Sequence, residues 1–126
     1  MEDVPSSETA ARHILVADDD EDVRDTLAAM IRHLGHRVQV EVDGASALQA
    51  VLKASVPPRL VLLDIAMPRL DGLTVAAHLA ALPSRPRVVL VTGGAVDCTR
   101  VRDLDGVDDV LLKPWSFADL QRVLAA

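Results

Sequence analysis

The stretch LVLLD at residues 60–64 decides the fold that we expect, because four consecutive aliphatic residues end on one acidic residue, Asp64. A continuous apolar run of this length is typical of a strand buried on both faces, as in a parallel sheet covered by helices. Three further runs have the same form and also end on polar residues: ILVA at 14–17 before Asp18 and Asp19, VVLV at 88–91 before Thr92, and VLL at 110–112 before Lys113.

The polar residues that follow these runs are expected to lie close together. If the runs are parallel strands of one sheet, their carboxyl ends share an edge, which is where open α/β sheets usually bind ligands. Three carboxylates, a hydroxyl and an ammonium would then converge there: Asp18, Asp19, Asp64, Thr92 and Lys113. A carboxylate nucleophile can form an aspartyl phosphate when the negative charge around it is offset. Mg²⁺ prefers oxygen ligands and is typically held by one or two carboxylates, which Asp18 and Asp19 supply.

Segments with helical periodicity separate the strands. We expect a first helix through Val23, Leu27, Met30, Ile31 and Leu34 that ends at Gly35, and a second that opens at Asp43 and Gly44 and continues through Leu48, Val51 and Leu52. A third helix should follow Asp71 and Gly72, with an inner stripe of Leu73, Ala76, Ala77 and Ala80. A short polar fourth helix is expected at 96–104, and a fifth with Phe117, Leu120, Val123 and Leu124.

Residues 38–42 differ from the other strands because apolar and polar residues alternate there. Val38, Val40 and Val42 alternate with Gln39 and Glu41, which is typical of a strand with one solvent-exposed face and places it at a sheet edge. Alternating strands and helices imply right-handed crossovers with helices on both faces. We therefore predict an α/β, flavodoxin-like (βα)5 fold, doubly wound, with a parallel five-stranded sheet in the order 2-1-3-4-5.

Composition places the chain among globular proteins and argues against several function classes. Its 126 residues, half of them apolar and a quarter charged, are the usual size of one domain. A net charge of −6 gives no electrostatic basis for direct nucleic-acid binding. No apolar stretch approaches the roughly 20 residues needed to cross a membrane, and the single Cys98 excludes an internal disulfide. We therefore expect a soluble cytoplasmic protein with a flexible leader or linker at 1–12 and one domain at 13–126.

Four motifs resemble those of a known family. They are ILVADDD at 14–20, LLDIAMPRLDG at 62–72, VTGG at 91–94 and LLKPW at 111–115. In this order and at these spacings they resemble the receiver domain of two-component response regulators. The resemblance extends from about His13 to Leu124, which is nearly the whole chain.

The resemblance implies a role for each residue of the site. Asp64 would accept a phosphoryl group from a sensor histidine kinase or a phosphotransfer protein, and Lys113 would pair with a phosphoryl oxygen. Asp19 would bind Mg²⁺ (or Mn²⁺) directly and Asp18 partly through water. Asp64 and the backbone carbonyl of Ala66 would complete the metal ligands.

The resemblance also implies a switch. The Thr92 hydroxyl would bond to the phosphoryl group and change the surface formed by about 95–124, which would then bind a downstream protein. The bond between Lys113 and Pro114 would be cis, as X–Pro bonds permit at modest cost. The family often has an aromatic residue three positions before the lysine, whereas this chain has Val110, so coupling through rotation of an aromatic side chain is not available here.

Other interpretations remain open. A small phosphatase of the haloacid-dehalogenase type would use Asp18 as nucleophile and Asp20 as acid/base, although its motif expects Thr or Val at the position of Asp22. The terminal receiver of a hybrid histidine kinase would fit the linker-like residues 1–12. A degenerate receiver that only binds a partner is disfavoured by the intact site chemistry.

Because the chain ends directly after the fifth helix, we expect no output domain and no enzymatic activity beyond self-phosphorylation and self-dephosphorylation. Signalling would go through a protein partner, without membrane or direct nucleic-acid contact, as a monomer or weak dimer.

Overall fold

The computed structural model describes residues 13–67, 70–93, 101, 103–104 and 106–125. Its strands are β1 (His13–Ala17), β2 (Arg37–Glu41), β3 (Leu60–Asp64), β4 (Arg87–Thr92) and β5 (Asp109–Leu112). The described helices are α2 (Glu21–His33), α3 (Gly44–Lys53), α4 (Gly72–Ala80) and α6 (Phe117–Ala125). All strand pairs are parallel, in the order β2-β1-β3-β4-β5, so the predicted flavodoxin-like fold is confirmed. The leader at 1–12 lies outside the described residues, as do residues 96–100 and 102 of the fourth helix predicted at 96–104.

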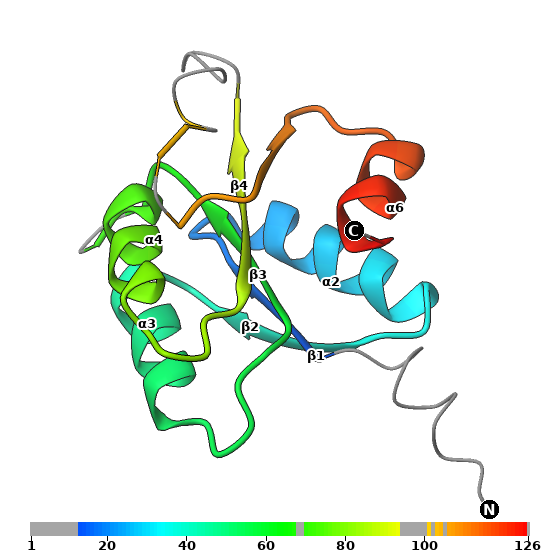
Figure 1. Ribbon diagram of the computed structural model, residues 1–126. Helices are drawn as coiled ribbons and strands as arrows, with labels where there is room; N and C mark the ends of the chain where they lie inside the picture. The colour runs from blue at the N-terminus through cyan, green and yellow to red at the C-terminus, as the bar shows by residue number, and fades with distance from the viewer. Residues whose placement is uncertain (1–12, 68–69, 94–100, 102, 105, 126) are drawn as a thin grey trace, which may run out of the picture.

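Helices cover both faces of the sheet, with α2 and α6 on one side and α3 and α4 on the other (Figure 1). Every residue of the central strand β3 is buried, as its continuous apolar run predicts. Successive side chains of a strand point to opposite faces. Val61 and Leu63 therefore pack in the cluster that contains α3 and α4, whereas Leu60 and Leu62 pack in the cluster that contains α2 and α6.

The inner stripe predicted for α4 is wrong by one residue. The buried residues of this helix are Gly72, Val75, Ala76 and Leu79, whereas Ala77 is exposed and Leu73 and Ala80 are only partly buried. Both sets have helical spacing, so a shift of one residue turns the inner face by roughly 100°. The rotation of α4 about its own axis is fixed by Gly72. This glycine is the first residue of the helix, faces inward and lies against the backbone of β3.

The strand β2 lies at the sheet edge, as predicted, but its alternation does not give one buried face. Val38 is partly buried and packs beside α2, whereas Val40 is 37% exposed. Val42 lies beyond the end of the strand and is 54% exposed. The reason is position: an edge strand has a neighbour on one side only, so less of each face is covered.

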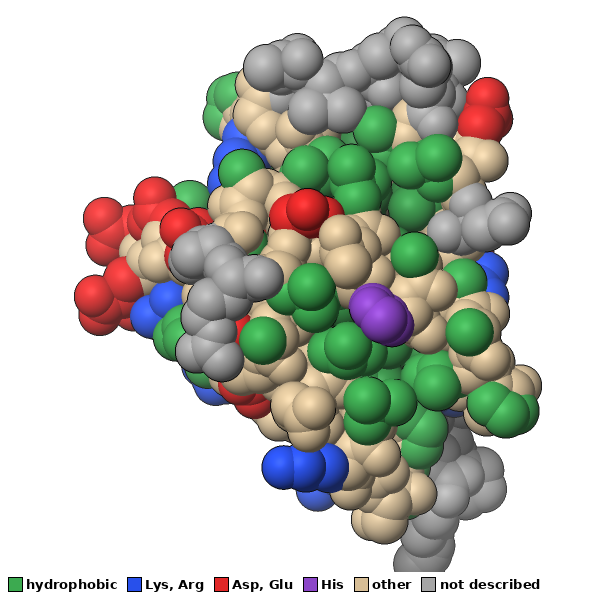
Figure 2. Space-filling view, turned by 90° about the vertical axis from the view of Figure 1, so that its left-hand side faces the viewer, with side chains coloured by type: hydrophobic (Ala, Val, Ile, Leu, Met, Phe, Trp, Pro, Cys, Tyr) green, Lys and Arg blue, Asp and Glu red, His purple; other side chains and the backbone are tan. Residues whose placement is uncertain are grey.

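The outer side of α3 and α4 carries exposed hydrophobic side chains among polar ones (Figure 2). Leu52, near the end of α3, is 52% exposed. Scattered exposed apolar residues of this kind are normal on globular proteins. Among the residues that the structure describes, no helix has the length and apolar character needed to cross a lipid bilayer.

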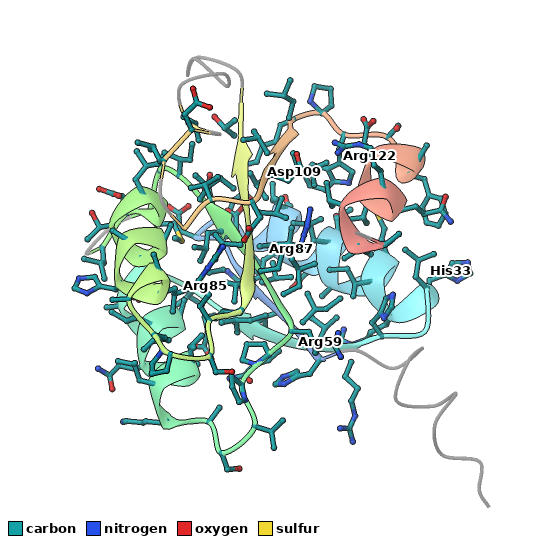
Figure 3. The ribbon with its side chains drawn as sticks, viewed as in Figure 1. His33, Arg59, Arg85, Arg87, Asp109 and Arg122 are labelled. Carbon is teal, nitrogen blue, oxygen red and sulfur yellow. The ribbon has the colours of Figure 1, made fainter. Side chains whose placement is uncertain are left out.

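Ion pairs join β4, β5 and α6 near the amino ends of these two strands, and the site described below lies at the carboxyl ends. Asp109 Oδ2, at the start of β5, lies 2.8 Å from Arg122 Nη1 on α6 and 3.6 Å from Arg87 Nη2 at the start of β4 (Figure 3). The neighbouring Asp108 accepts hydrogen bonds from both terminal nitrogens of Arg85, at 3.0 and 3.1 Å. These contacts join the start of β5 to the chain around the start of β4 and to the helix α6.

Candidate functional site

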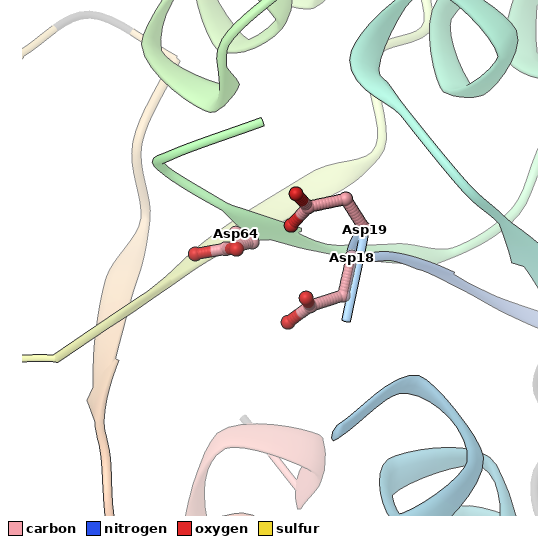
Figure 4. A group of neighbouring side chains, drawn as sticks. All are labelled: Asp18, Asp19 and Asp64. Carbon is pink, nitrogen blue, oxygen red and sulfur yellow. The ribbon is translucent and has the colours of Figure 1, made fainter. Parts of the chain in front are cut away.

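Three carboxylates meet at the carboxyl edge of the sheet. Asp18 and Asp19 follow the last residue of β1, and Asp64 is the last residue of the adjacent strand β3. One carboxylate oxygen from each of the three lies within 4.8 Å of the others (Figure 4). The convergence predicted from the ends of the apolar runs is therefore present for these residues.

Asp18 is held in one orientation by the start of α2. Its Oδ1 accepts a hydrogen bond from the Asp20 backbone N–H at 2.9 Å, and its backbone carbonyl accepts one from Arg24 Nη1 at 3.0 Å. The Asp20 carboxylate in turn caps α2 by accepting from the N–H groups of Asp22 and Val23. The Asp18 side chain is almost fully buried, and its Oδ2 has no hydrogen-bond partner among the described residues. This oxygen is the one that faces Lys113.

Lys113 brings the ammonium group to the cluster. It follows β5, and its Nζ lies 3.5 Å from Asp18 Oδ2 and 3.7 Å from Asp64 Oδ1. The Lys113 backbone N–H donates to the Thr92 carbonyl at 2.7 Å, which continues the pairing with β4 one residue beyond the end of β5. The peptide bond between Lys113 and Pro114 is cis, as the family resemblance implies.

The charges around Asp64 are not balanced. Burial raises the pKa of the Asp64 carboxyl to about 6, and the neighbouring charges of Asp18 and Asp19 also raise it. Two interactions oppose the rise: the Lys113 ammonium and a hydrogen bond from the Ala66 backbone N–H. Among these described groups, one cation faces three carboxylates, so further positive charge would be favoured at this site.

Thr92 ends β4 beside the end of β3. The two strands pair so that Asp64 is opposite Val91, and the Ile65 N–H donates to the Val91 carbonyl at 3.1 Å. The Thr92 side chain is buried, at the sheet edge where the carboxylates lie. Of the residues predicted for the site, Asp18, Asp19, Asp64 and Lys113 are thus brought into one cluster, with Thr92 on the adjoining strand end.

Two supporting residues were not assigned a role from the sequence. Gly72 packs so closely against β3 that a Cβ atom there would overlap the Asp64 carbonyl oxygen. Its N–H also donates to the Ile65 carbonyl at 3.0 Å. The other residue is Arg24, which fixes the Asp18 backbone. The sequence contains a signal for Gly72, since the motif Asp71-Gly72 opens a helix after the loop from β3, but no pattern indicates the contact of Arg24.

Comparison with known proteins assigns the family. The model of the response regulator receiver domain matches residues 14–125, and the chain belongs to this family. It is similar to the response regulator MprA of Mycolicibacterium vanbaalenii, with 39% identity over 108 residues that cover 85% of this chain and 46% of that protein. The chain thus spans about half the length of the curated relatives it matches.

Solved structures show the same domain. The receiver domain of the sensor histidine kinase PA1611 from Pseudomonas aeruginosa, determined with a magnesium ion coordinated in its active site cleft, is 30% identical with a TM-score of 0.80. The match covers 91% of this chain and 95% of that one. NtrX from Brucella abortus, in a complex with ATP, is 33% identical with a TM-score of 0.80, over 90% of this chain and 26% of that one. The protein described here is therefore a signalling domain of the two-component type.

Proposed function

We propose that this receiver domain accepts a phosphoryl group on Asp64 from the phosphohistidine of a sensor kinase or of a phosphotransfer protein. The observation that carries the proposal is the cluster of Asp18, Asp19 and Asp64 around Lys113 at the carboxyl edge of the sheet. In the transfer, an Asp64 oxygen forms a bond to phosphorus while the nitrogen–phosphorus bond breaks, and the imidazole leaves with the electron pair. The Lys113 ammonium, close to Asp64 Oδ1, is placed to pair with a phosphoryl oxygen as a point charge.

The residues of the site fit a bound Mg²⁺ ion. All the side-chain donors are carboxylate oxygens, which Mg²⁺ prefers. The buried Asp18 Oδ2 lacks a hydrogen bond within the described chain, and burial and like charges raise the pKa of Asp64. We propose that Asp18, Asp19 and Asp64 hold the metal together with the backbone carbonyl of Ala66; Mn²⁺ suits the same ligands. When bound, the cation would offset the negative charge of the acceptor and of the incoming phosphoryl group.

We further propose that phosphorylation is passed to the surface formed by 95–124 through Thr92. Thr92 lies on the strand between β3, which carries the acceptor, and β5, which crosses that surface. Because Val110 is buried in the core and is not aromatic, the change would be a displacement of backbone and not a rotation of an aromatic side chain. A downstream protein would then bind one state of this surface better than the other.

The setting of the domain in a longer protein is also a proposal. The favoured form is a cytoplasmic regulator with residues 1–12 as leader or linker and 13–126 as the receiver. The alternative is the receiver of a hybrid histidine kinase, which the similarity to the sensor kinase receiver from Pseudomonas aeruginosa favours. In both settings the chemistry at Asp64 is the same.

Labelling with acetyl phosphate tests the proposed function. In the presence of Mg²⁺ the chain should gain one phosphoryl group by intact mass, and a chelator should prevent the gain. Asp64→Asn should abolish uptake, while Asp25→Asn, an exposed carboxylate of α2 outside the cluster, should retain it. Uptake that survives in Asp64→Asn and disappears in Asp18→Asn would overturn the proposal in favour of a phosphatase that uses Asp18 as nucleophile.

A further inference from the structure

An open pocket of about 500 Å³ is lined in part by Lys113, the residue whose ammonium faces the acidic cluster. One wall is a single face of α2, formed by Val23, Thr26 and Met30, which follow one another at helical spacing. A second wall is formed by the segment after β5, including Trp115. Val23, Met30 and Trp115 are partly buried against the hydrophobic core, so these apolar walls are held in place.

The pocket and the proposed acceptor site share a wall. Lys113 lines the pocket, and its Nζ is also the group 3.7 Å from Asp64 Oδ1. Gly93 lines the pocket as well and directly follows Thr92. This pocket is therefore within reach of the rest of a small molecule whose phosphoryl group lies beside Lys113 and Asp64.

The size and lining of the pocket indicate what kind of chemical group the non-phosphoryl part of this small molecule carries. An apolar cavity of about 150 Å³ is enough to bind benzene in proteins, and ligand pockets commonly measure about 300–1,000 Å³. The walls from α2 and Trp115 offer aliphatic and aromatic contacts, and an aromatic ring prefers such surroundings. An acetyl group would leave most of this apolar surface in contact with water.

We propose that the pocket is a subsite for the leaving group of a small phosphoryl donor, and that it selects acyl phosphates with an apolar, ring-sized acyl group. The inference rests on the proposed function, because the phosphoryl group must go to Asp64. In the step, an Asp64 oxygen forms a bond to phosphorus, the bond between phosphorus and the acyl oxygen breaks, and the carboxylate leaves with the electron pair. The step needs no proton transfer, and Lys113 lies where the departing carboxylate and the phosphoryl oxygens carry negative charge.

The test compares two donors, benzoyl phosphate and acetyl phosphate, on the same chain with Mg²⁺. The rate of phosphoryl gain is measured by intact mass, and the ratio of the two rates gives the preference. We expect benzoyl phosphate to react at least about ten times faster than acetyl phosphate, since even one added methylene in an apolar pocket changes rates by about tenfold or more. Comparing ratios between variants removes the difference in intrinsic reactivity of the donors.

Matched substitutions separate the pocket from the acceptor site. Met30→Gln replaces an apolar side chain of the wall with an amide of similar length. The preference for benzoyl phosphate over acetyl phosphate should then fall about fivefold. Trp115→Leu makes the side chain smaller and keeps it apolar, and it should also lower the preference for benzoyl phosphate. Leu52→Gln makes the same kind of change as Met30→Gln at an exposed position of α3, outside the pocket, and should leave both rates unchanged.

The outcomes of the two proposals are distinguishable. If acetyl phosphate labels Asp64 but the preference is the same in the native chain, Met30→Gln and Trp115→Leu, the subsite is wrong and the acceptor function stands. If neither donor labels Asp64, the acceptor function is wrong and the subsite falls with it. A preference that falls in both pocket variants and persists in Leu52→Gln supports the subsite.

Discussion

At the scale of the residue, Asp64 gives the chain a dependence of stability on pH. Burial and the nearby carboxylates raise its pKa to about 6, so the folded protein binds this proton more tightly than the unfolded chain does. The contribution of Asp64 to the free energy of unfolding therefore falls as the pH rises from the ordinary aspartate value towards about 6, and stays low above it. Asp64→Asn removes the charge and should raise the free energy of unfolding by about 1–3 kcal/mol at about pH 8, and by little at about pH 4.

Urea denaturation across this pH range, in the presence of a chelator, measures the effect. Asp25→Asn serves as the control, because Asp25 is an exposed carboxylate of α2 outside the cluster. The control should follow the pH dependence of the native chain. If Asp64→Asn also follows it, Asp64 is not the group with the raised pKa.

Asp19 gives a second prediction at this scale, on metal binding. Its carboxylate is exposed and contributes one of the three oxygens of the cluster, so Asp19→Asn should weaken Mg²⁺ binding with little change in the packing of the apo protein. A ligand that binds the folded state raises the melting temperature. Millimolar Mg²⁺ should therefore raise the melting temperature of the native chain and of Asp25→Asn, and raise that of Asp19→Asn much less. An equal rise in all three would remove Asp19 from the metal site.

At the scale of the element, the start of α4 fixes the position of the acceptor. Alanine favours helices over glycine by about 1 kcal/mol, but a Cβ atom at Gly72 would overlap the Asp64 carbonyl oxygen. Backbone cannot move as easily as a side chain, so we expect Gly72→Ala to lower the free energy of unfolding by about 1–3 kcal/mol. It should also slow labelling of Asp64, because the end of β3 must shift.

Gly93→Ala is the matched substitution for this prediction, since a Cβ atom there meets nothing within 4 Å. Its free energy of unfolding should stay close to that of the native chain in urea denaturation. A stability of Gly72→Ala equal to that of Gly93→Ala would show that the close contact of α4 with β3 does not hold the acceptor.

The elements also show how far sequence patterns extend. Four strands were predictable because their continuous apolar runs are too short for helices, and β2 was predictable because apolar and polar residues alternate in it. The orientation of α4 was not, because the helix is apolar nearly all round and two stripes, one residue apart, have the same spacing. The contact of Gly72 with β3 determines which of the two stripes faces the core. This contact forms only in the folded structure, so the sequence pattern of the helix does not reveal it.

At the scale of the whole molecule, the parallel sheet assembles the site. Side chains as far apart in the sequence as Asp18 and Lys113 come within 3.5 Å because β1, β3, β4 and β5 end at the same edge. This convergence could be predicted, since it follows from strand direction alone. The pocket beside Lys113 could not, because it depends on how α2 and the segment around Trp115 pack against the sheet.

Mapping the phosphoryl group to a single residue tests the central claim most directly. The native chain would be labelled with acetyl phosphate and Mg²⁺, treated with borohydride to reduce the acyl phosphate to homoserine, and sequenced by tandem mass spectrometry. We predict homoserine at position 64 and at no other aspartate of the cluster. Homoserine at position 18 or 19, with position 64 unchanged, would contradict the account.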